Sequence, residues 1–537
     1  MKGRTRAGAG ALAVLLAVSA CSFTEGAEAA GTLRVLAGSE LADMEPLLAE
    51  SAERTGVELV LDYSGTLDGT ERVLAGAVED YDAVWFPSNR YLHLADGDRS
   101  SVRDETSVML SPVVLGVSAS RAEGLGWVDG DGSVSGVTWE DVTLAVEEEG
   151  LTYGMSSPAA SNSGFSALIG AASAMADSGA ALEREDVAGV EGRLAAFFSG
   201  QELTAGSSGW LMEEFERRRR DVSGSGAVAP DGVVNYESVL LSYAPDSGED
   251  PLVLVYPEDG VVTADYPLTL LADASDEAAA AYERVVADLT SAEVQARIAE
   301  ATFRRPVAAG VSERGFPSVV ELPFPARREV VDELVSAYFS ELRRPARTVY
   351  VLDVSGSMSG SRISGLRRAL TVLTGADEGP LSSRGQVFQE REEVTLLPFS
   401  DEPGEPVSFV VEPEGADSAR RGLAEEIAAL EVGGETAAYD AVEAAYSLLE
   451  EAGEDGYLSS VVLMTDGEVN RGLDLDGLLA SLDGPPSHAA AAPVFTVLFG
   501  EADAEEMERL SSRTGGRVFD ARDLDLEEVF REIRGYH

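Results

Sequence analysis

The stretch Val349-Tyr350-Val351-Leu352-Asp353-Val354-Ser355-Gly356-Ser357-Met358 decides the fold of the C-terminal part of the chain. Residues 348–353 are predicted to form a buried strand, because four apolar residues follow one another without polar alternation. The strand ends on Asp353, and Ser355 and Ser357 follow on a loop that would lead into a helix. Ligand sites in open α/β sheets lie outside the carboxyl ends of the strands. One carboxylate and two hydroxyls suit a hard cation such as Mg²⁺, but they are too few to enclose it.

Two later segments offer the further oxygen atoms that such a site needs. Residues 461–467 read Val-Val-Leu-Met-Thr-Asp-Gly, which predicts a second apolar strand ending on Asp466. The loop Gly433-Gly434-Glu435-Thr436 precedes a predicted helix at 437–451. The carboxyl ends of parallel strands share one edge of a sheet, so the three segments are expected to meet there.

Asp-x-Ser-x-Ser, a Gly-Gly-x-Thr loop and an apolar strand ending in Thr-Asp-Gly, in this order, resemble the von Willebrand factor type A domain. The resemblance covers about residues 346–537 and implies a doubly wound, Rossmann-like α/β domain with a metal-ion-dependent adhesion site. It implies that the metal is touched by Ser355, Ser357 and Thr436, and directly or through water by Asp353 and Asp466. The expected ion is Mg²⁺, with Mn²⁺ or Ca²⁺ as alternatives, and an acidic side chain of a partner protein would complete its coordination.

Two observations qualify this resemblance. Glu435 adds a charge beside Thr436, where related domains often carry a neutral residue. The alternative interpretation of Asp353 and the two serines is that they only cap the following helix, a role that needs no metal.

The charge balance excludes one class of partner. The 537 residues include 95 acidic and 40 basic side chains, for a net charge of −55, and Lys2 is the only lysine. Nucleic acid is not expected as a partner, because phosphate binding needs basic patches. Direct binding to an anionic membrane surface is disfavoured for the same reason. The simplest interpretation of the acidity is a surface adapted for solubility.

The N-terminus predicts a lipid anchor. Residues 1–20 combine a basic start with a short apolar run, as in a signal peptide. Val18-Ser19-Ala20-Cys21 then resembles the cleavage box of bacterial lipoproteins, whose cysteine carries the lipid (palmitate). Cys21 is the only cysteine, so no intramolecular disulfide can form. The expected product has a tether at 21–30 and lies on the extracytoplasmic face of the cell membrane, held only by its lipid.

Residues 31–322 alternate predicted strands and helices. Strands at 32–37, 57–63 and 81–86, with helices at 41–55 and 67–78 between them, form a βαβαβ unit with a parallel sheet. This region resembles a two-lobed periplasmic solute-binding protein of type 2. An extended segment at 107–118 would cross into the second lobe, and strands at 252–256 and 261–271 would return to the first. A loop is expected at 153–164, before a helix at 165–175, and helical structure at 278–302.

Polar residues at the ends of these predicted elements form the candidate solute site. Some follow predicted strands and others precede a helix, whose free backbone N–H groups favour anions. The candidates are Ser39, Thr66, Ser88, Ser161, Asn162 and Ser163. Helix capping is the competing interpretation for each of them. The expected ligand is a small polar or anionic solute.

The remaining features favour a binding protein over an enzyme. Residues 323–345 read as a proline-rich linker and a helix that ends before Pro345. The three histidines, His93, His488 and His537, adjoin no obvious nucleophile, and motifs of the P-loop, HExxH and GxSxG types are absent from the sequence. Two versions stay open, solute capture combined with protein binding, or adhesion alone after loss of solute binding. The alternative function is a metal-dependent hydrolase or a chelatase-like accessory subunit.

Replacing the lone cysteine tests the anchor. Cys21→Ser removes the only thiol that can carry lipid, so the protein is expected to leave the membrane fraction for the soluble extracytoplasmic fraction. Fractionation followed by immunoblotting measures this. A variant that stays in the membrane fraction in unchanged amount contradicts the lipoprotein interpretation.

Overall fold

The computed structural model describes residues 31–537 apart from short gaps. The gaps are 131, 221–228, 244–249, 309, 312–314, 376–386, 454–455, 468, 483–488, 490–491, 501–503, 523–528, 531–532 and 535–537. The predicted signal peptide, Cys21 and the tether lie outside the described residues. Within the described ranges, every helix is too short or too polar to cross a membrane.

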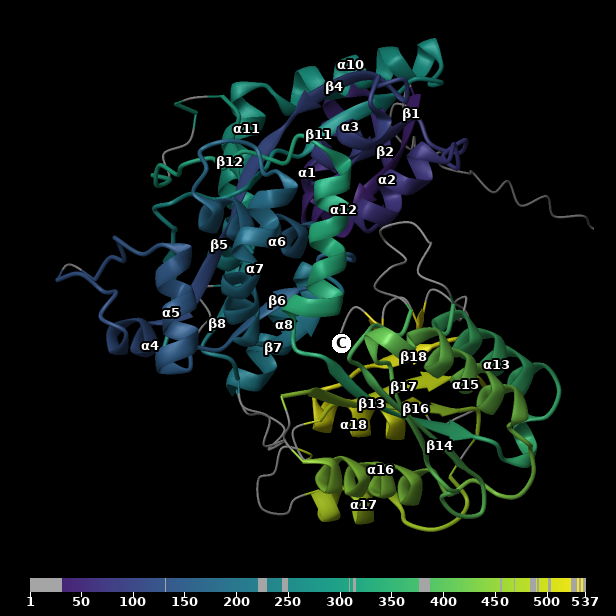
Figure 1. Cartoon of the computed structure of the whole chain (residues 1–537). Coiled ribbons are helices and arrows are strands. Elements are labelled where there is room, and N and C mark those ends of the chain that lie inside the picture. The colour runs from purple at the N-terminus through teal and green to yellow at the C-terminus, as the bar shows by residue number, and fades with distance from the viewer. Residues whose placement is uncertain are drawn as a thin grey trace, which may run out of the picture.

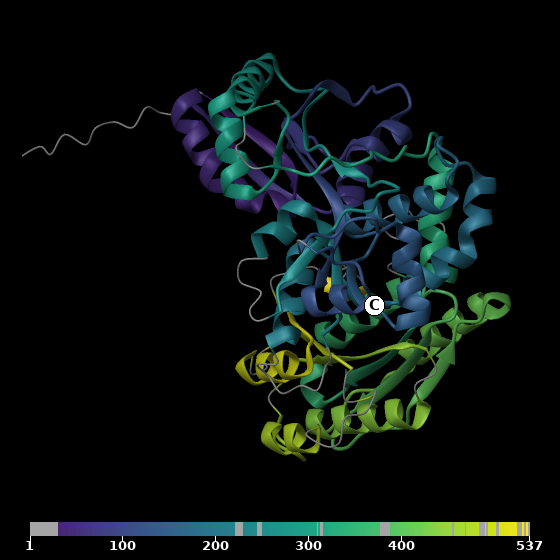
Figure 2. The same ribbon diagram turned by 90° about the vertical axis from the view of Figure 1, so that its left-hand side faces the viewer.

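Three α/β bodies follow one another, and Figures 1 and 2 both show the N-terminal one at the top and the C-terminal one at the bottom. The first body contains a sheet of order β2-β1-β3-β11-β4, with β1, β2 and β3 parallel. Its strands are β1 (Gly31–Gly38), β2 (Val57–Ser64), β3 (Ala83–Trp85), β4 (Val102–Ser107) and β11 (Pro267–Leu271). Its helices are η1 (Ser39–Met44), α1 (Glu45–Thr55), α2 (Thr66–Leu74), α3 (Arg90–Asp96), α10 (Asp276–Leu289) and α11 (Ala292–Thr302).

The second body contains a sheet of order β10-β5-β8-β6-β7, and β9 and β12 also pair with β5. Its strands are β5 (Met109–Ser118), β6 (Tyr153–Ser156), β7 (Gln201–Ala205), β8 (Gly232–Tyr236), β9 (Leu252–Val255), β10 (Thr263–Ala264) and β12 (Arg305–Pro306). Its helices are α4 (Ala119–Gly124), α5 (Trp139–Glu149), α6 (Asn162–Ala176), α7 (Arg184–Ser199), α8 (Ser208–Arg220) and α9 (Glu237–Tyr243). The first two bodies are the lobes of a two-lobed α/β domain, as the sequence predicts.

The sequence misplaces four segments of this domain. The expected loop at 153–164 contains β6, a buried strand between β7 and β8, and α6 already begins at Asn162. The expected return strand at 252–256 stays in the second lobe as β9, because it pairs with β5. The run at 261–271 is split into β10 and β11 by Tyr266, whose φ is 41°. The helical region at 278–302 is two helices, since Ser291 caps α11 by accepting a hydrogen bond from Val294 N–H.

The lobes are joined where the chain crosses between the sheets. One crossing lies between β4 and β5 at Val108, and another between β10 and β11 at Tyr266. They run side by side, because Val108 N–H donates to the Tyr266 carbonyl oxygen at 3.3 Å. The lobes also touch directly, since a Cβ on Gly65 of the first would lie 2.7 Å from the Ala160 carbonyl oxygen of the second.

The third body has a sheet of order β15-β14-β13-β16-β17-β18, parallel except for its edge strand β15. Its strands are β13 (Ala346–Asp353), β14 (Glu393–Phe399), β15 (Val407–Val410), β16 (Leu458–Thr465), β17 (Val494–Leu498) and β18 (Val518–Asp520). Its described helices include α13 (Ser361–Leu373), α15 (Ala416–Ala429), α16 (Ala438–Ala452), α17 (Leu475–Leu482) and α18 (Ala504–Thr514). This is the doubly wound fold that the sequence predicts, with β13 buried along its whole length.

Helix α12 (Arg328–Ala337) and a following π-helical turn, η3 (Tyr338–Leu342), connect the lobes to the third body. In Figure 1, α12 runs down past α6 toward β13. It contacts α3 of the first lobe and α6 and α7 of the second. Tyr91 of α3 donates to Asp332 at 3.0 Å, and Tyr338 donates to Gln201 of β7 at 3.0 Å. The connection is therefore packed against both lobes and is not a free linker.

A buried ionic cluster fixes the start of the third body. The carboxylate of Glu392 accepts hydrogen bonds from Arg343, which follows η3, at 2.5 Å, and from Arg534, near the C-terminus, at 2.8 Å. All three side chains are almost completely buried. Removing one member of such a cluster leaves an unpaired buried charge, which costs more than the pairing itself contributes.

We therefore predict that Glu392→Ala destabilises the third body strongly. Two buried guanidinium groups lose their counter-charge, at a cost of about 3–5 kcal/mol. For a body of this size, that lowers the melting temperature by on the order of 10 °C. Differential scanning calorimetry measures the shift, with Glu414→Ala, an exposed glutamate, as the control. Equal melting temperatures for the two variants contradict the prediction.

Candidate metal and solute sites

Asp353 is the buried anchor of the candidate metal site. Its side chain has no exposed surface, and each carboxylate oxygen accepts a hydrogen bond. Oδ1 accepts from the Ser355 N–H at 2.8 Å, and Oδ2 from the Thr465 hydroxyl at 2.7 Å. Thr465 ends the neighbouring strand β16, so this contact ties the ends of two strands together. Burial raises the pKa of Asp353, with a smaller upward contribution from the charge of Asp466.

Hydroxyl groups connect this anchor to the second carboxylate. Ser355 Oγ lies 2.9 Å from Ser357 Oγ, and the Ser357 hydroxyl donates to Asp466 Oδ1 at 2.7 Å. Asp353, Ser355 and Asp466 are buried, whereas Ser357 is exposed. These contacts thus connect the buried Asp353 to the exposed Ser357 at the edge of the sheet.

The glycine loop brings Thr436 to the same edge. Gly356 N–H donates to the Gly434 carbonyl oxygen at 3.1 Å, and the Asn470 side chain accepts from Thr436 N–H at 2.9 Å. A Cβ placed on Gly467 would lie 3.5 Å from Ser357 Oγ and 3.7 Å from Thr436 Oγ1. The hydroxyls of Ser357 and Thr436 therefore face one small space, and all five residues predicted for the metal lie around it.

The donor set consists of two carboxylates and three hydroxyls. Within the described ranges, no group of three or more His, Cys, Asp or Glu side chains could hold a metal, so any cation here relies on hydroxyl oxygens. All-oxygen donors suit Mg²⁺, Mn²⁺ or Ca²⁺ and not a soft metal. Glu435, the charged residue beside Thr436, forms an ion pair with Arg471 at 2.8 Å. The residues therefore fit a hard cation.

Sequence reasoning missed two residues of this site. Thr465 is part of the Thr-Asp-Gly motif, but its contact with Asp353 follows only from strand register. Arg362, at the start of α13, donates to Asp466 Oδ2 at 2.5 Å. Its guanidinium places a positive charge against the outer oxygen of Asp466. A cation bound near that oxygen would be repelled by it.

The six residues predicted for the solute occupy three kinds of position. Ser39 follows β1 and is exposed, and Thr66 is buried at the start of α2. Ser88 accepts a hydrogen bond from Arg90 N–H at 3.3 Å, a local contact just before α3, whose N-cap is Asn89. Ser161, Asn162 and Ser163 are buried together at the start of α6.

Four buried serines meet in the second lobe. Ser163 Oγ lies 2.7 Å from Ser156 Oγ and 2.7 Å from Ser208 Oγ, and Ser161 Oγ lies 3.2 Å from Ser163 Oγ. Ser161 and Ser208 stand at the starts of α6 and α8, so two helix N-termini point to this cluster. Ser161 makes no side-chain capping bond to α6. Simple capping therefore does not explain it.

A second polar cluster lies where the lobes meet. Tyr266 occupies a crossing between the lobes and is fully buried, and its hydroxyl makes no well-aligned hydrogen bond, although the Arg304 side chain lies beside it. The guanidinium of Arg304 lies 5.0 Å from the centre of the Tyr266 ring and donates to Asp43 and to the Glu40 carbonyl oxygen, but its Nε is also unpartnered. Burial raises the pKa of the Glu40 carboxyl.

The second lobe completes this junction. Tyr236 ends β8, and its ring centre lies 6.1 Å from that of Tyr266. Its hydroxyl accepts a hydrogen bond from the Asn162 side chain at 3.0 Å. Asn162, one of the predicted solute residues, thus contacts the junction directly. A buried polar group without a well-aligned hydrogen bond is costly, which marks the Tyr266 hydroxyl as a position where a ligand would supply a better partner.

Family comparison divides the chain into the same two parts. The model of the bacterial extracellular solute-binding protein family matches residues 33–304, and that of the von Willebrand factor type A domain matches residues 349–532. Among curated proteins, inter-alpha-trypsin inhibitor heavy chain H4 of Sus scrofa is 27% identical over 205 residues. The match covers 35% of this chain and about a fifth, 20%, of that relative.

Solved structures with similar folds include proteins of both kinds. The periplasmic binding protein AfuA of Actinobacillus pleuropneumoniae, with fructose-6-phosphate bound, is 11% identical, with a TM-score of 0.44 over 58% of this chain and 99% of that one. The sulfate-binding protein SubI of Mycobacterium tuberculosis is 17% identical, with a TM-score of 0.40 over 55% and 93%. A von Willebrand factor type A protein of Catenulispora acidiphila is 19% identical, with a TM-score of 0.28 over 36% and 42%.

Proposed function

Because the chain belongs to the bacterial extracellular solute-binding protein family and carries a von Willebrand factor type A domain after it, we propose a binding protein with two separate sites. The type A domain binds a protein partner through a divalent cation, and the two-lobed domain holds a small polar or anionic solute. Family membership indicates an extracytoplasmic location, and lipid on Cys21 is the proposed anchor.

The convergence of two carboxylates and three hydroxyls at one sheet edge carries the metal proposal. Ser355, Ser357 and Thr436 would hold the cation, with Asp353 and Asp466 binding it directly or through water. Asp353 accepts from the Ser355 N–H and the Thr465 hydroxyl, and Asp466 accepts from the Ser357 hydroxyl. Few charged ligands leave a bound Mg²⁺ with net positive charge, and Mg²⁺ keeps water in its remaining positions. When bound, the cation supplies a Lewis-acid site that takes a carboxylate from the partner.

The chain's own residues prepare this site. Two hydrogen bonds hold the Asp353 carboxylate in one orientation, and Asp353 in turn orients the Ser355 loop. The Ser357 hydroxyl is exposed, so the open side of the site faces the partner. Arg362 donates a hydrogen bond to Asp466 Oδ2, and its positive charge lowers the affinity of the sheet edge for a cation.

The buried hydroxyl of Tyr266, which has Arg304 beside it but makes no well-aligned hydrogen bond, carries the solute proposal. A polar solute at the lobe junction gives this hydroxyl and Arg304 Nε well-aligned hydrogen bonds. The buried serines and Asn162 of the second lobe supply further hydroxyl and amide groups. Burial raises the pKa of the Glu40 carboxyl near Arg304, which favours its neutral form.

The metal proposal predicts specific binding of Mg²⁺ and Mn²⁺ by the full chain. Ser357→Ala and Asp353→Ala should each lower the affinity at least about tenfold, since each removes an oxygen from the edge. Arg362→Ala should bind Mg²⁺ more tightly, because a like charge is removed. Isothermal titration calorimetry of chelator-treated protein measures these changes.

Ser359→Ala is the matched control, because Ser359 is an exposed serine of the same loop whose hydroxyl donates only to the Gly356 carbonyl oxygen. It also corrects for weak cation binding by the acidic surface. Circular dichroism checks that the variants fold. If Asp353→Ala does not fold, Ser357→Ala alone still tests the metal site. Equal Mg²⁺ affinities for the Ser357→Ala and Ser359→Ala variants contradict the proposed metal site.

The solute proposal predicts that Tyr266→Phe abolishes solute binding without lowering the stability of the unliganded protein. The unliganded protein should melt at about the wild-type temperature, because the lost hydroxyl makes no well-aligned hydrogen bond. The rise in melting temperature caused by the best solute from a panel of small hydroxylated and anionic compounds should disappear. Thermal-shift measurement provides both readouts.

Tyr282→Phe is the opposite control, since the Tyr282 hydroxyl donates to the Leu268 carbonyl oxygen at 3.0 Å. It should cost about 1 kcal/mol of stability and leave the solute-induced shift unchanged. A panel that shifts neither wild type nor variants favours the version in which the first domain no longer binds a solute.

A further inference from the structure

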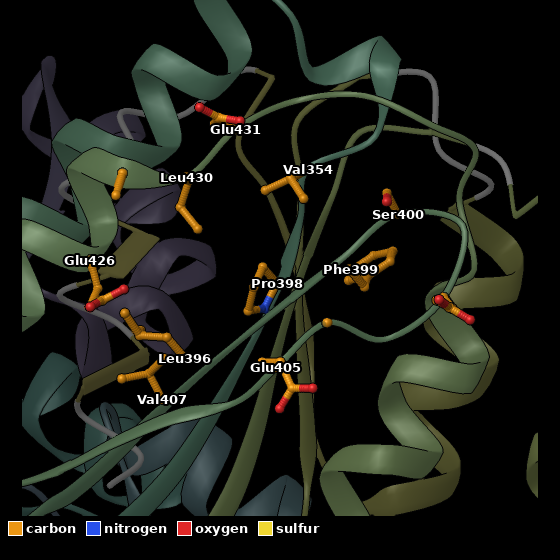
Figure 3. Close-up of a pocket in the computed structure, with 13 residues that line it drawn as sticks. Val354, Leu396, Pro398, Phe399, Ser400, Glu405, Val407, Glu426, Leu430 and Glu431 are labelled. Atoms are coloured by element: carbon orange, nitrogen blue, oxygen red, sulfur yellow. The ribbon is translucent and has the colours of Figure 1, made fainter.

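A pocket opens directly beside the proposed metal site. It encloses about 410 Å³, within the range of roughly 300–1,000 Å³ that is usual for ligand pockets. Its wall comes from the end of β13, from β14 and β15, and from the end of α15, as Figure 3 shows. The apolar residues of its wall are Val354, Leu396, Pro398, Phe399, Val407 and Leu430.

The rim of this pocket is uniformly acidic. The four carboxylate side chains that line it are all exposed, namely Glu402, Glu405, Glu426 and Glu431. Figure 3 shows the last three standing around the apolar side chains from different sides. None of the described residues that line the pocket is basic. Arg367 donates to the Leu430 carbonyl oxygen but is not one of the lining residues.

The pocket and the metal site share their walls. Val354 lies between Asp353 and Ser355 in the chain, and its carbonyl oxygen accepts from Gly433 N–H at 2.8 Å. Ser400, another lining residue, accepts from Ala437 N–H at 2.9 Å, next to Thr436. One short segment of a partner can therefore reach both places at once.

We propose that this pocket binds a lysine or arginine side chain of the partner segment whose carboxylate reaches the metal. The apolar wall covers the aliphatic stem, and the glutamates pair with the charged head. The pocket deepens the proposed function, on which it rests, by specifying the partner: an exposed segment with an acidic and a basic residue a few positions apart.

The occupant follows from charge complementarity. An acidic side chain is repelled by the rim, and a purely apolar one leaves the glutamates without a partner. A cation with an aliphatic stem satisfies both parts of the pocket. The attraction is between exposed charges, so it weakens as salt is added.

The test uses short capped alanine peptides that contain one aspartate and, at each nearby spacing, lysine, norleucine or glutamate. Affinity for the full chain is measured in Mg²⁺ by fluorescence anisotropy. At the best spacing, lysine should bind about fivefold to tenfold more tightly than norleucine, and the preference should shrink at high salt. The Glu426→Gln, Glu431→Gln double variant should lose most of it.

Two variants separate the pocket from the metal site. Glu425→Gln, an exposed neighbour on α15 that does not line the pocket, should keep the lysine preference. Ala429→Phe, which places a ring into the pocket wall, should lose the preference yet keep the Mg²⁺-dependent binding of the aspartate. Norleucine binding as tightly as lysine at every spacing overturns the proposal.

A metal-free arm distinguishes failure of the pocket from failure of the proposed function. N-acetyl-lysine methylamide, with the norleucine analogue as control, is titrated in chelator while the Val354, Val407 and Leu430 methyl signals are followed by NMR. Selective shifts with the lysine probe support the pocket even if no aspartate peptide binds in Mg²⁺. Absence of any lysine-selective shift, together with Mg²⁺-dependent aspartate binding, overturns the pocket alone.

Discussion

The burial of one carboxylate constrains the geometry of the third body. Asp353 ends a strand that is buried along its whole length, so its charge cannot be solvated by bulk water. It is compensated by donors from its own loop and from the end of β16. Those contacts fix the relative register of β13 and β16 and the path of the Ser355–Ser357 loop. The hydroxyls that face the edge are held in place as a result.

Most of the candidate metal site could be predicted from the sequence, because its residues sit at strand ends that the apolar runs define. The predicted strand at 348–353 lies within β13, and the apolar run that begins at Val461 lies within β16. Thr465 and Arg362 could not be assigned contacts, since these depend on strand register and on the direction of α13. Local sequence does not report either property.

The solute site could be predicted less well, for a physical reason. Tyr266 and Arg304 become neighbours only because the chain crosses between the lobes twice and returns, and no local pattern records that approach. The strand β6 was missed because it is short and is followed by serines and a proline, which usually indicate a loop. Ser161 and Ser163 are among the predicted residues, but Ser156 and Ser208, which Ser163 contacts, lie on elements that carry no clear sequence signal.

The carboxylates of the two neighbouring sites have different surroundings. The proposed metal site uses only two carboxylates, both buried and both already hydrogen-bonded. The pocket beside it uses carboxylates that are exposed to solvent. A net charge of −55 therefore says little about either place by itself. The surroundings of each carboxylate decide what it can do.

Helix α12 has a mechanical consequence. It is hydrogen-bonded to the first lobe through Asp332, and the turn that follows it is hydrogen-bonded to the second lobe through Tyr338. Only three residues, 343–345, separate that turn from β13. A rotation of one lobe against the other must therefore either break one of these bonds or carry the helix along. In the second case, the movement of the helix is passed to the amino end of β13, the strand that ends on Asp353.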